Sequence, residues 1–317
     1  MTDKLRKIAF VFPGQGAQYI GMGLDLTERS PELLQPLSDF DRENNLNLTS
    51  IIKEGPEEKL KDTKYTQPAI LFHSIIALQS LQKLIPVKPD FVAGHSLGEI
   101  TSLVANGVLN LKDALYLVHR RGEFMIKANE GTPFAMAAII GLPAAEIKDI
   151  CQEASETGLV IVANYNSPEQ TVISGTEEGV NRACELAKER GAKRALLLPV
   201  GGPFHSPLIA RAEKWLAEEM DKIEFRQSSI PVISNVDAQP HTDPSEIKSN
   251  LAQQVTSSVL WVDSVKRMIA MGTRLFLEFG PKKVLAGMIK KIDRNIEILS
   301  IDTIQDLELA KEKLDRL

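Results

Sequence analysis

The chain has 317 residues, which is enough for one large domain or two domains of ordinary size. Apolar residues make up 43% of the chain and charged residues 25%, a composition typical of globular proteins. The net charge of −5 shows no excess of basic residues, so we expect neither nucleic acid nor an anionic membrane surface as a partner.

The N-terminal segment and the cysteines indicate a cytoplasmic protein. Residues 1–7 are polar and charged, and the apolar core of a signal peptide does not follow them. No stretch approaches the ~20 apolar residues that a membrane span needs. Cys151 and Cys184 are the only cysteines, and neither lies in a CxxC pair or a histidine cluster. We therefore expect two buried thiols, no metal site and no disulfide framework.

The first elements predict a mostly parallel sheet covered by helices. Residues 8–12 form a continuous apolar run that ends at Pro13-Gly14, as in a strand buried on both faces. Residues 67–84 carry apolar side chains at helical spacing, and a second short apolar run follows at 91–93. Residues 99–105 then have the pattern of a helix. This alternation of helix and strand is typical of an α/β fold.

A serine lies between glycines at the turn that joins strand 91–93 to helix 99–105. The sequence Gly94-His95-Ser96-Leu97-Gly98 has the pattern of a nucleophile elbow. The turn needs residues without bulk, which Gly94 and Gly98 provide. The bend exposes the Ser96 hydroxyl beside the first amides of a helix, where negative charge is stabilised. The pattern favours an acyl-enzyme, although a structural turn of small residues is the alternative.

The middle of the chain predicts a small inserted unit. Strands and helices alternate there in the order β-α-β-β-α-β, which is the ferredoxin-like plan. The predicted elements are strand 134–140, helix 143–155, strands 159–164 and 170–174, helix 177–190 and strand 193–199. Glycine and proline at 131–133 and 201–203 mark the crossing points. We therefore expect a small subdomain at 132–202 and a large domain formed by 1–131 and 203–317.

The α/β pattern resumes after the insert. Residues 230–235 and 274–279 read as strands, and Gly280-Pro281 opens another helix. Residues 304–317 form a charged amphipathic pattern, which predicts a surface helix.

A serine nucleophile needs a base, and the sequence has five histidines. His205 is favoured because its loop follows the last strand of the insert, at a junction where clefts form. His95 is next to Ser96 but is expected to point away from it, with a secondary role. His73 reads as a packed or surface residue of its helix. His119 falls off the apolar stripe of its helix, and His241 falls in a loop.

No acid that would orient the histidine is evident. Asp237 and Glu278 follow apolar runs, but each reads more simply as a structural residue. A backbone carbonyl is the alternative, which would make the pair a dyad. The loop Gly14-Gln15-Gly16 could donate one oxyanion N–H, with Leu97 as the second donor. A plain glycine turn explains the same loop equally well.

Arg121 lies in the middle of an apolar helix stripe. In the helix 113–127 the stripe consists of Ala114, Leu117, Val118 and Met125. A guanidinium on an inward face needs a partner, because burying it alone costs several kcal/mol. Two interpretations of Arg121 remain: it forms a structural salt bridge, or it binds a substrate carboxylate through two parallel hydrogen bonds.

Five motifs in register carry a resemblance to a known family. They are Phe12-Pro13-Gly14-Gln15-Gly16-Ala17-Gln18, Gly94-His95-Ser96-Leu97-Gly98-Glu99, Arg121-Gly122, Asn164-Tyr165-Asn166-Ser167-Pro168 and Phe204-His205-Ser206. The chain resembles, end to end, the acyltransferases of fatty-acid and polyketide synthesis that load malonyl groups onto acyl carrier protein. The resemblance implies a hydrolase-like α/β domain with a ferredoxin-like insert.

The resemblance also implies the roles of single residues. Ser96 would carry the malonyl ester and His205, oriented by a main-chain carbonyl, would be its base. Gln15 and Leu97 would supply the oxyanion amides, and Arg121 would bind the free malonyl carboxylate. Phe204 resembles the malonyl-type form of its motif. The substrate-binding residues predicted from the resemblance are Arg121, Phe204, His95 and Asn166.

The implied reaction takes malonyl-CoA and a holo acyl carrier protein as substrates and needs no metal or other cofactor. We expect a monomer. A free-standing polyketide acyltransferase is the alternative, followed by an editing thioester hydrolase and a non-catalytic carrier-binding scaffold. One departure concerns 256–261, Thr-Ser-Ser-Val-Leu-Trp, where many relatives carry Asn-Pro-Val before an aromatic residue. That region supports the histidine in the family.

Overall fold

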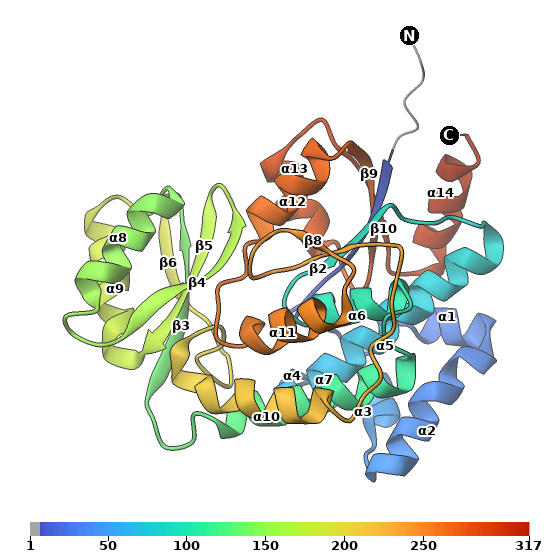
Figure 1. Cartoon of the computed structure of the whole chain (residues 1–317), viewed down its shortest axis with the longest axis horizontal. Coiled ribbons are helices and arrows are strands. Elements are labelled where there is room, and N and C mark those ends of the chain that lie inside the picture. The colour runs from blue at the N-terminus through green and yellow to red at the C-terminus, as the bar shows by residue number, and fades with distance from the viewer. Residues whose placement is uncertain (1–6, 317) are drawn as a thin grey trace.

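The computed structural model describes residues 7–316, so the polar segment 1–6 and Leu317 lie outside it. Two sheets organise the chain, a large one and a smaller one at one end of the molecule (Figure 1). The large sheet has the order β10-β9-β1-β2-β7-β8, parallel except for the last pair. Its strands are β1 (Lys7–Phe12), β2 (Phe91–Gly94), β7 (Val232–Ile233), β8 (Pro240–His241), β9 (Thr273–Phe279) and β10 (Glu297–Ile301).

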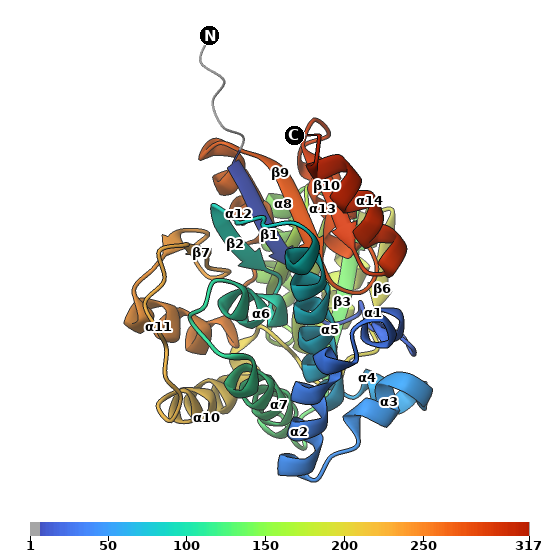
Figure 2. The ribbon, with the colours of Figure 1, turned by 90° about the vertical axis from the view of Figure 1, so that its right-hand side faces the viewer.

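Helices cover both faces of the large sheet, which explains the unbroken apolar run of β1. Phe10 and Phe12 face one hydrophobic cluster, whereas Ala9 and Val11 face another. The first cluster lies under α5 (Thr63–Leu84), α6 (Leu97–Ala105), α7 (Leu111–Lys127) and α14 (Ile304–Leu314), and the second under α12 (Trp261–Ala270) and α13 (Val284–Ile292). Figure 2 shows α5 and α6 in front of the sheet, with α12 behind it.

The remaining helices extend the large unit at its edges. The segment before α5 folds into short helices: α1 (Leu24–Arg29), η1 (Pro31–Leu34), α2 (Gln35–Asn44), α3 (Leu48–Glu54) and α4 (Glu57–Lys61). A second group follows the small sheet: η2 (Pro207–Ile209), α10 (Ala210–Met220) and α11 (Pro244–Gln254). No helix within residues 7–316 combines the length and the apolar character needed to cross a membrane.

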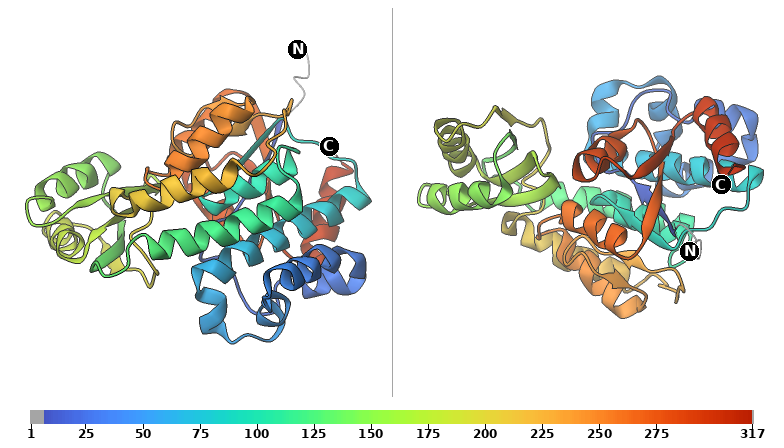
Figure 3. Two further views of the ribbon diagram at one scale, coloured as in Figure 1. Left: turned by 60° about the horizontal axis from the view of Figure 1, so that its bottom comes forward. Right: turned by 90° about the horizontal axis from the view of Figure 1, so that it is seen from above.

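The small sheet is antiparallel and has the strand order β4-β5-β3-β6. Its elements run β3 (Phe134–Ile140), α8 (Ala144–Ala154), β4 (Val160–Ser167), β5 (Gln170–Thr176), α9 (Glu177–Glu189) and β6 (Arg194–Leu197), in the β-α-β-β-α-β order predicted from the sequence. Ala137 and Ile139 pack under α8 and α9 in a separate core, whereas Met136 and Ala138 face the large unit. Figure 3 shows this unit projecting from one end of the molecule.

The structure corrects several predicted boundaries. Helix α5 begins at Thr63 rather than at residue 67, because the Asp62 side chain accepts a hydrogen bond from the Lys64 N–H and caps it. Strand β7 has two residues instead of the expected six, and His241 lies in strand β8 rather than in a loop. Strand β10 was not predicted. The last helix ends at Leu314.

Candidate active site

The predicted elbow joins β2 to α6 at Ser96. The Ser96 backbone has φ 53° and ψ −108°, a conformation that residues with a side chain rarely adopt. A Cβ added to Gly94 would lie 1.9 Å from the Gly98 carbonyl, and one added to Gly98 would lie 2.0 Å from the Phe12 carbonyl oxygen. The two glycines therefore let α6 begin directly against strands β1 and β2, and the tight turn presents the serine side chain.

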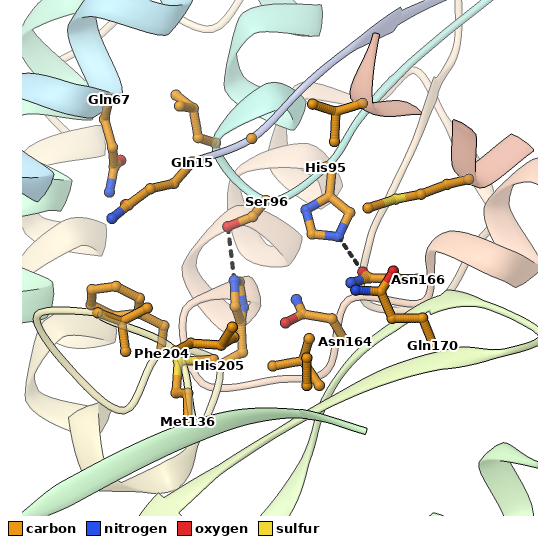
Figure 4. Close-up of a pocket in the computed structure, with 18 of the residues that line it drawn as sticks. Gln15, Gln67, His95, Ser96, Met136, Asn164, Asn166, Gln170, Phe204 and His205 are labelled. Atoms are coloured by element: carbon orange, nitrogen blue, oxygen red, sulfur yellow. Dashed lines mark hydrogen bonds between the residues drawn. The ribbon is translucent and has the colours of Figure 1, made fainter. Parts of the chain in front are cut away.

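Ser96 and His205 form a hydrogen-bonded pair although they lie 109 residues apart. Ser96 Oγ is 2.8 Å from His205 Nε2 (Figure 4). His205 Nδ1 is 2.9 Å from the carbonyl oxygen of Gln254, and only a protonated Nδ1 can bond there. Burial, followed by the charge of Arg121, lowers the pKa of His205 to about 3. The neutral ring therefore presents Nε2 as an acceptor for the serine proton.

Two backbone amides face the same cavity without an internal partner. Neither the Gln15 nor the Leu97 N–H donates to an acceptor within residues 7–316, and both residues line the cavity. Leu97 is the first residue of α6, where the helix dipole places partial positive charge. The Gln15 side chain is held by the Thr63 hydroxyl at 3.2 Å. These amides have the chemistry of an oxyanion site, and their role stays a prediction.

Arg121 projects from α7 into the same space with 1% of its surface exposed. One terminal nitrogen donates to Gln67 Oε1 at 2.8 Å, and the other donates to Gln254 Oε1 at 2.8 Å and to Ser96 Oγ at 3.0 Å. Its Nε has no partner, and no carboxylate within residues 7–316 forms an ion pair with it. The structural salt bridge is therefore absent from the described chain, and the carboxylate-binding alternative is the one the geometry favours.

The cavity lies between the two sheets and has a volume of about 220 Å³. Ser96, His205 and Arg121 line one side of it. The small sheet lines the other side with apolar side chains such as Met136 and with the amides of Asn164, Asn166 and Gln170 (Figure 4). The apolar residues of this side and its surroundings are Met125, Met136, Ala138, Val172, Leu198, Val200, Phe204, Val284, Leu285 and Met288. The cavity thus has a charged group at one side and a largely apolar lining, which suits a long ligand with a polar end.

His95 and Asn166 connect the two units at the cavity wall. His95 Nε2 is 2.8 Å from Asn166 Oδ1, and the Trp261 ring lies edge-on to the imidazole at 5.9 Å between centroids. Burial lowers the pKa of His95, so the ring is neutral. Both residues line the cavity together with Phe204, so all four predicted substrate-binding residues meet there.

A sequence profile described as "Acyl transferase domain" matches residues 9–307 of this chain. The chain belongs to the acyl transferase family. A malonyl CoA-acyl carrier protein transacylase of Bacillus subtilis (strain 168) is 45% identical over 311 residues, which cover 98% of each protein. One of Staphylococcus aureus (strain MRSA252) is 39% identical over 305 residues, covering 96% of this chain and 98% of that protein.

Solved structures of acyl transferases share the whole fold. The malonyl CoA-acyl carrier protein transacylase of Coxiella burnetii has a TM-score of 0.94 at 40% identity, covering 98% of each chain. A malonyl-transacylase in complex with a type II PKS acyl-carrier protein has a TM-score of 0.93 at 36% identity, covering 97% of this chain and 99% of that one.

Neither carboxylate considered as a third catalytic member contacts His205 in this acyl transferase. Asp237 Oδ2 is 2.8 Å from His241 Nε2, and Glu278 accepts the backbone N–H groups of Leu285 and Ala286. The imidazole is held by the Gln254 carbonyl instead, the alternative that the sequence left open. A carbonyl acceptor is available from any residue type, which explains why no acidic side chain is needed.

The remaining histidines lie away from the cavity. His73 is buried on α5, with Nε2 3.1 Å from Asp302 Oδ1. His119, off the apolar stripe as predicted, is nevertheless only 7% exposed, and its Nδ1 lies 3.0 Å from the Lys64 carbonyl oxygen. The apolar face of α7 is wider than the stripe, because α2 and α5 pack against it from different sides.

The divergent segment 256–261 packs against His95 through one aromatic side chain and directly follows the backbone that holds His205. The N–H of His205 donates to the Val255 carbonyl at 3.1 Å, just before this segment. Trp261 is fully buried against His95. The Val259 N–H and carbonyl pair with Ala163 and Tyr165 of β4.

Four buried polar residues of the site were not predicted from the sequence. They are Gln67, Glu99, Asn235 and Gln254. Asn235 Oδ1 accepts the Ser96 N–H at 2.7 Å and its Nδ2 donates to the Gly94 carbonyl at 2.7 Å, which locks the elbow. Glu99 lies within the elbow motif, but nothing in the local pattern says that it points inward. Gln67 and Gln254 are amides in ordinary helices and carry no sequence signature.

Proposed function

We propose that this acyl transferase moves a malonyl group from malonyl-CoA to the phosphopantetheine thiol of an acyl carrier protein. A malonyl ester of Ser96 is the intermediate. One observation carries the proposal: Ser96 Oγ lies 2.8 Å from the imidazole of His205 and 3.0 Å from the guanidinium of Arg121. A base and a fixed cation thus flank one hydroxyl. The proposed substrates are those in the names of the similar proteins.

In the first step, Ser96 Oγ attacks the thioester carbonyl of malonyl-CoA while its proton passes to His205 Nε2. The tetrahedral oxyanion accepts hydrogen bonds from the Gln15 and Leu97 amides, each contributing about 3 kcal/mol. The C–S bond then breaks, and the departing CoA thiolate takes the proton from Nε2. In the second step, the carrier thiol gives its proton to Nε2 and attacks the ester. The C–O bond to Ser96 breaks, and the proton returns to Oγ.

Arg121 would select acyl groups that end in a carboxylate. Its buried guanidinium pairs with no carboxylate within residues 7–316 and is held by neutral amides, so a substrate carboxylate in the cavity would gain charge-assisted hydrogen bonds from it. Burial lowers the pKa of Arg121 to about 10, which still leaves it charged at neutral pH. Acid–base chemistry rests on His205 and charge stabilisation on amides and Arg121, so the proposed steps need no metal or redox cofactor.

The rival functions fit the site less well. An editing thioester hydrolase clears simple acyl groups, for which a carboxylate-binding arginine is superfluous. A non-catalytic scaffold leaves the Ser96–His205 pair unexplained. A free-standing polyketide acyltransferase would have the same site, and the likeness to a malonyl-transacylase bound to a type II PKS carrier supports that alternative. Fatty-acid synthesis is the proposed role.

The proposal extends to the architecture. The large unit is hydrolase-like and formed by 1–131 and 203–317, and the small unit, 132–202, is ferredoxin-like. Its strand order, with β3 and β5 central and β6 at the edge beside β3, supports that description. We also propose that the protein acts as a cytoplasmic monomer, because one chain supplies every group that the two steps use.

The direct test is mass spectrometry of the intact protein after mixing with malonyl-CoA. We expect one malonyl group per chain, mapped to the peptide that contains Ser96, and its release when holo acyl carrier protein is added. The Ser96→Ala variant is the control and should stay unlabelled. Rapid release of free malonate without a carrier would favour the hydrolase instead.

The Arg121→Ala variant tests the selectivity. We expect kcat/KM for malonyl-CoA to fall by about a hundredfold, because a charged hydrogen bond of about 3 kcal/mol is lost. Acetyl-CoA lacks the carboxylate, so its transfer should fall far less. An equal loss for both thioesters would show that Arg121 serves the nucleophile and not the acyl carboxylate.

A further inference from the structure

Gln254 contacts Ser96, His205 and Arg121 together. It ends α11 and is fully buried. Its backbone carbonyl accepts from His205 Nδ1 at 2.9 Å, and its side-chain Oε1 accepts from Arg121 at 2.8 Å. Its Nε2 donates to the carbonyl of Ser96 at 3.0 Å. Backbone and side chain thus have separate tasks, and a substitution at 254 leaves the carbonyl acceptor of His205 in place.

Behind the Gln254 amide lies a buried carboxylate that the proposed mechanism does not use. Glu99 is 1% exposed, and its Oε2 accepts from Gln254 Nε2 at 2.7 Å and from the Asn235 N–H at 3.0 Å. The chain of contacts therefore runs from the guanidinium of Arg121 through a neutral amide to the carboxylate of Glu99. Burial raises the pKa of Glu99 to about 7, so its carboxyl group is partly ionised at neutral pH. It lies on the other side of the amide from Arg121, and the two side chains do not touch.

The surroundings of the amide fix which way it points. Every group near Gln254 Nε2 is an acceptor, namely the Glu99 carboxylate, the Ser96 carbonyl and, at 3.3 Å, the side-chain oxygen of Asn235. The opposite orientation would place an NH₂ group against the N–H donors of Arg121 and leave buried groups unpaired, which is costly. Oε1 is therefore held toward Arg121.

A direct carboxylate in place of the amide would change the chemistry of the site. An Arg–carboxylate pair engages the guanidinium donors, and a fixed negative charge there would repel an incoming carboxylate. We propose that Gln254 is a positioning residue that acts as a neutral spacer: its amide orients Arg121 beside Ser96 and keeps Glu99 from pairing with it, so that the guanidinium stays available for the acyl carboxylate. This inference rests on the proposed function.

Gln254→Glu is the first test, because it keeps the shape of the side chain and places a carboxyl oxygen on Arg121. Its second oxygen replaces the Nε2 that donates to Ser96, Glu99 and Asn235, so the total activity of this variant should also fall, and only the ratio of the two substrates is compared. The readout is kcat/KM for Ser96 acylation by malonyl-CoA relative to acetyl-CoA. We expect the malonyl preference to fall by at least about tenfold, mainly through a higher KM, because like charges oppose each other in the buried site. Equal losses for both thioesters, or an unchanged preference, would overturn the proposal, since a scaffolding role affects both substrates alike.

Glu99→Gln is the matched control. It keeps an oxygen for the Gln254 and Asn235 donors but removes the charge behind the spacer. We expect the malonyl preference to stay within about threefold of the wild type or to rise, because the spacer and Arg121 are unchanged. A tenfold fall would mean that Arg121 depends on the Glu99 charge directly, which would overturn the spacer role.

A second pair of variants covers the case in which Gln254→Glu does not fold. Gln254→Asn and Gln254→Asp shorten the side chain equally and differ only in charge. The aspartate should lose at least about tenfold more of the malonyl preference than the asparagine, and equal preferences would refute the proposal. Labelling of wild-type Ser96 by malonyl-CoA, measured alongside, reports on the proposed function independently of these comparisons.

Discussion

At the scale of single residues, Ser96, the proposed nucleophile, has an unfavourable backbone conformation. Ser96 is held at φ 53° and ψ −108°, where its Cβ is crowded by the neighbouring backbone. The N–H of Ser96 donates to Asn235 and its carbonyl accepts from Gln254, so tertiary contacts hold the conformation in place. The local strain is thus offset by the buried amides that surround the turn.

Two substitutions at this position separate the strain from the hydroxyl. Ser96→Ala and Ser96→Gly both remove Oγ and both should abolish acylation, but only glycine removes Cβ. We expect Ser96→Gly to be more stable than Ser96→Ala by roughly 1 kcal/mol, the relieved strain less the extra entropy of glycine in the unfolded chain. Urea unfolding of the two variants measures the difference. If the alanine variant is the more stable, the turn is not strained by its side chain.

The sequence predicts the reacting residues far better than the residues that hold them. Ser96 and His205 stand in motifs with a chemical meaning, and Arg121 stands out as a charge in an apolar stripe. Gln254 acts partly through a backbone carbonyl, which every residue has, and it contacts the Ser96 carbonyl across 158 positions of sequence. Only the fold brings α11 against the elbow, so its role has no local signature.

At the scale of elements, the site depends on how closely α6 approaches β1. Gly98 lies where the first turn of α6 crosses the end of β1, and a Cβ there would lie 2.0 Å from the Phe12 carbonyl oxygen and 2.9 Å from that of Pro13. Both contacts are with backbone, which cannot rotate away. The elbow and the loop that follows β1, which we propose to supply one oxyanion donor, therefore share one tight interface.

Gly98→Ala should disrupt that interface. We expect a loss of at least about 3 kcal/mol of folding free energy, together with loss of Ser96 acylation, because α6 must move away from β1. Gly287→Ala is the control, since Gly287 is exposed within α13 and a Cβ there meets no atom within 4 Å. That variant should gain roughly 0.5 to 1 kcal/mol from helix propensity. Thermal unfolding and acylation of both variants check the contrast.

The strands that the sequence misjudged are those with little sheet around them. β10 is an edge strand that pairs only with β9, and Glu297 and Ser300 interrupt its apolar run. β7 is shorter than its apolar run, because Pro231 at its start has no N–H to donate. The interior strands β1, β9 and β3 match their predicted bounds to within one residue, because side chains on both of their faces are buried. The edge strand β6 is shorter than predicted and mostly exposed.

At the scale of the whole molecule, one segment joins the two units at the cavity. Ser258 Oγ donates to the Val162 carbonyl at 2.6 Å, and the Val259 N–H donates to the Ala163 carbonyl at 2.8 Å, both on β4. The same stretch of chain carries Gln254 at its start and Trp261 at its end. The contacts between the two units and the contacts that hold His205 therefore come from one continuous stretch of backbone. This stretch couples the relative placement of the units to the geometry of the Ser96–His205 pair.

The stability of the molecule should depend on pH through its buried carboxyl groups. Burial raises the pKa of Glu278 from 4.5 to about 7, although the N–H groups of Leu285 and Ala286 and the hydroxyl of Ser300 favour the ionised form. Between these two pH values the folded protein binds a proton that the unfolded chain has released. This contribution to the free energy of unfolding is fully present below pH 4.5 and is lost as the pH rises through about 7.

Glu278→Gln isolates this contribution, because every other titrating group is common to both proteins. The variant loses an acceptor for a backbone N–H, which lowers its stability by an amount that does not depend on pH. In addition to that constant difference, the amount by which the free energy of unfolding of the wild type exceeds that of the variant should decrease between pH 4.5 and 7, by up to roughly 3 kcal/mol. Urea unfolding at several pH values measures both parts. Two parallel curves would mean that burial does not shift this carboxyl group. Acylation of Ser96 should persist in the variant, because Glu278 serves the start of α13 and not His205.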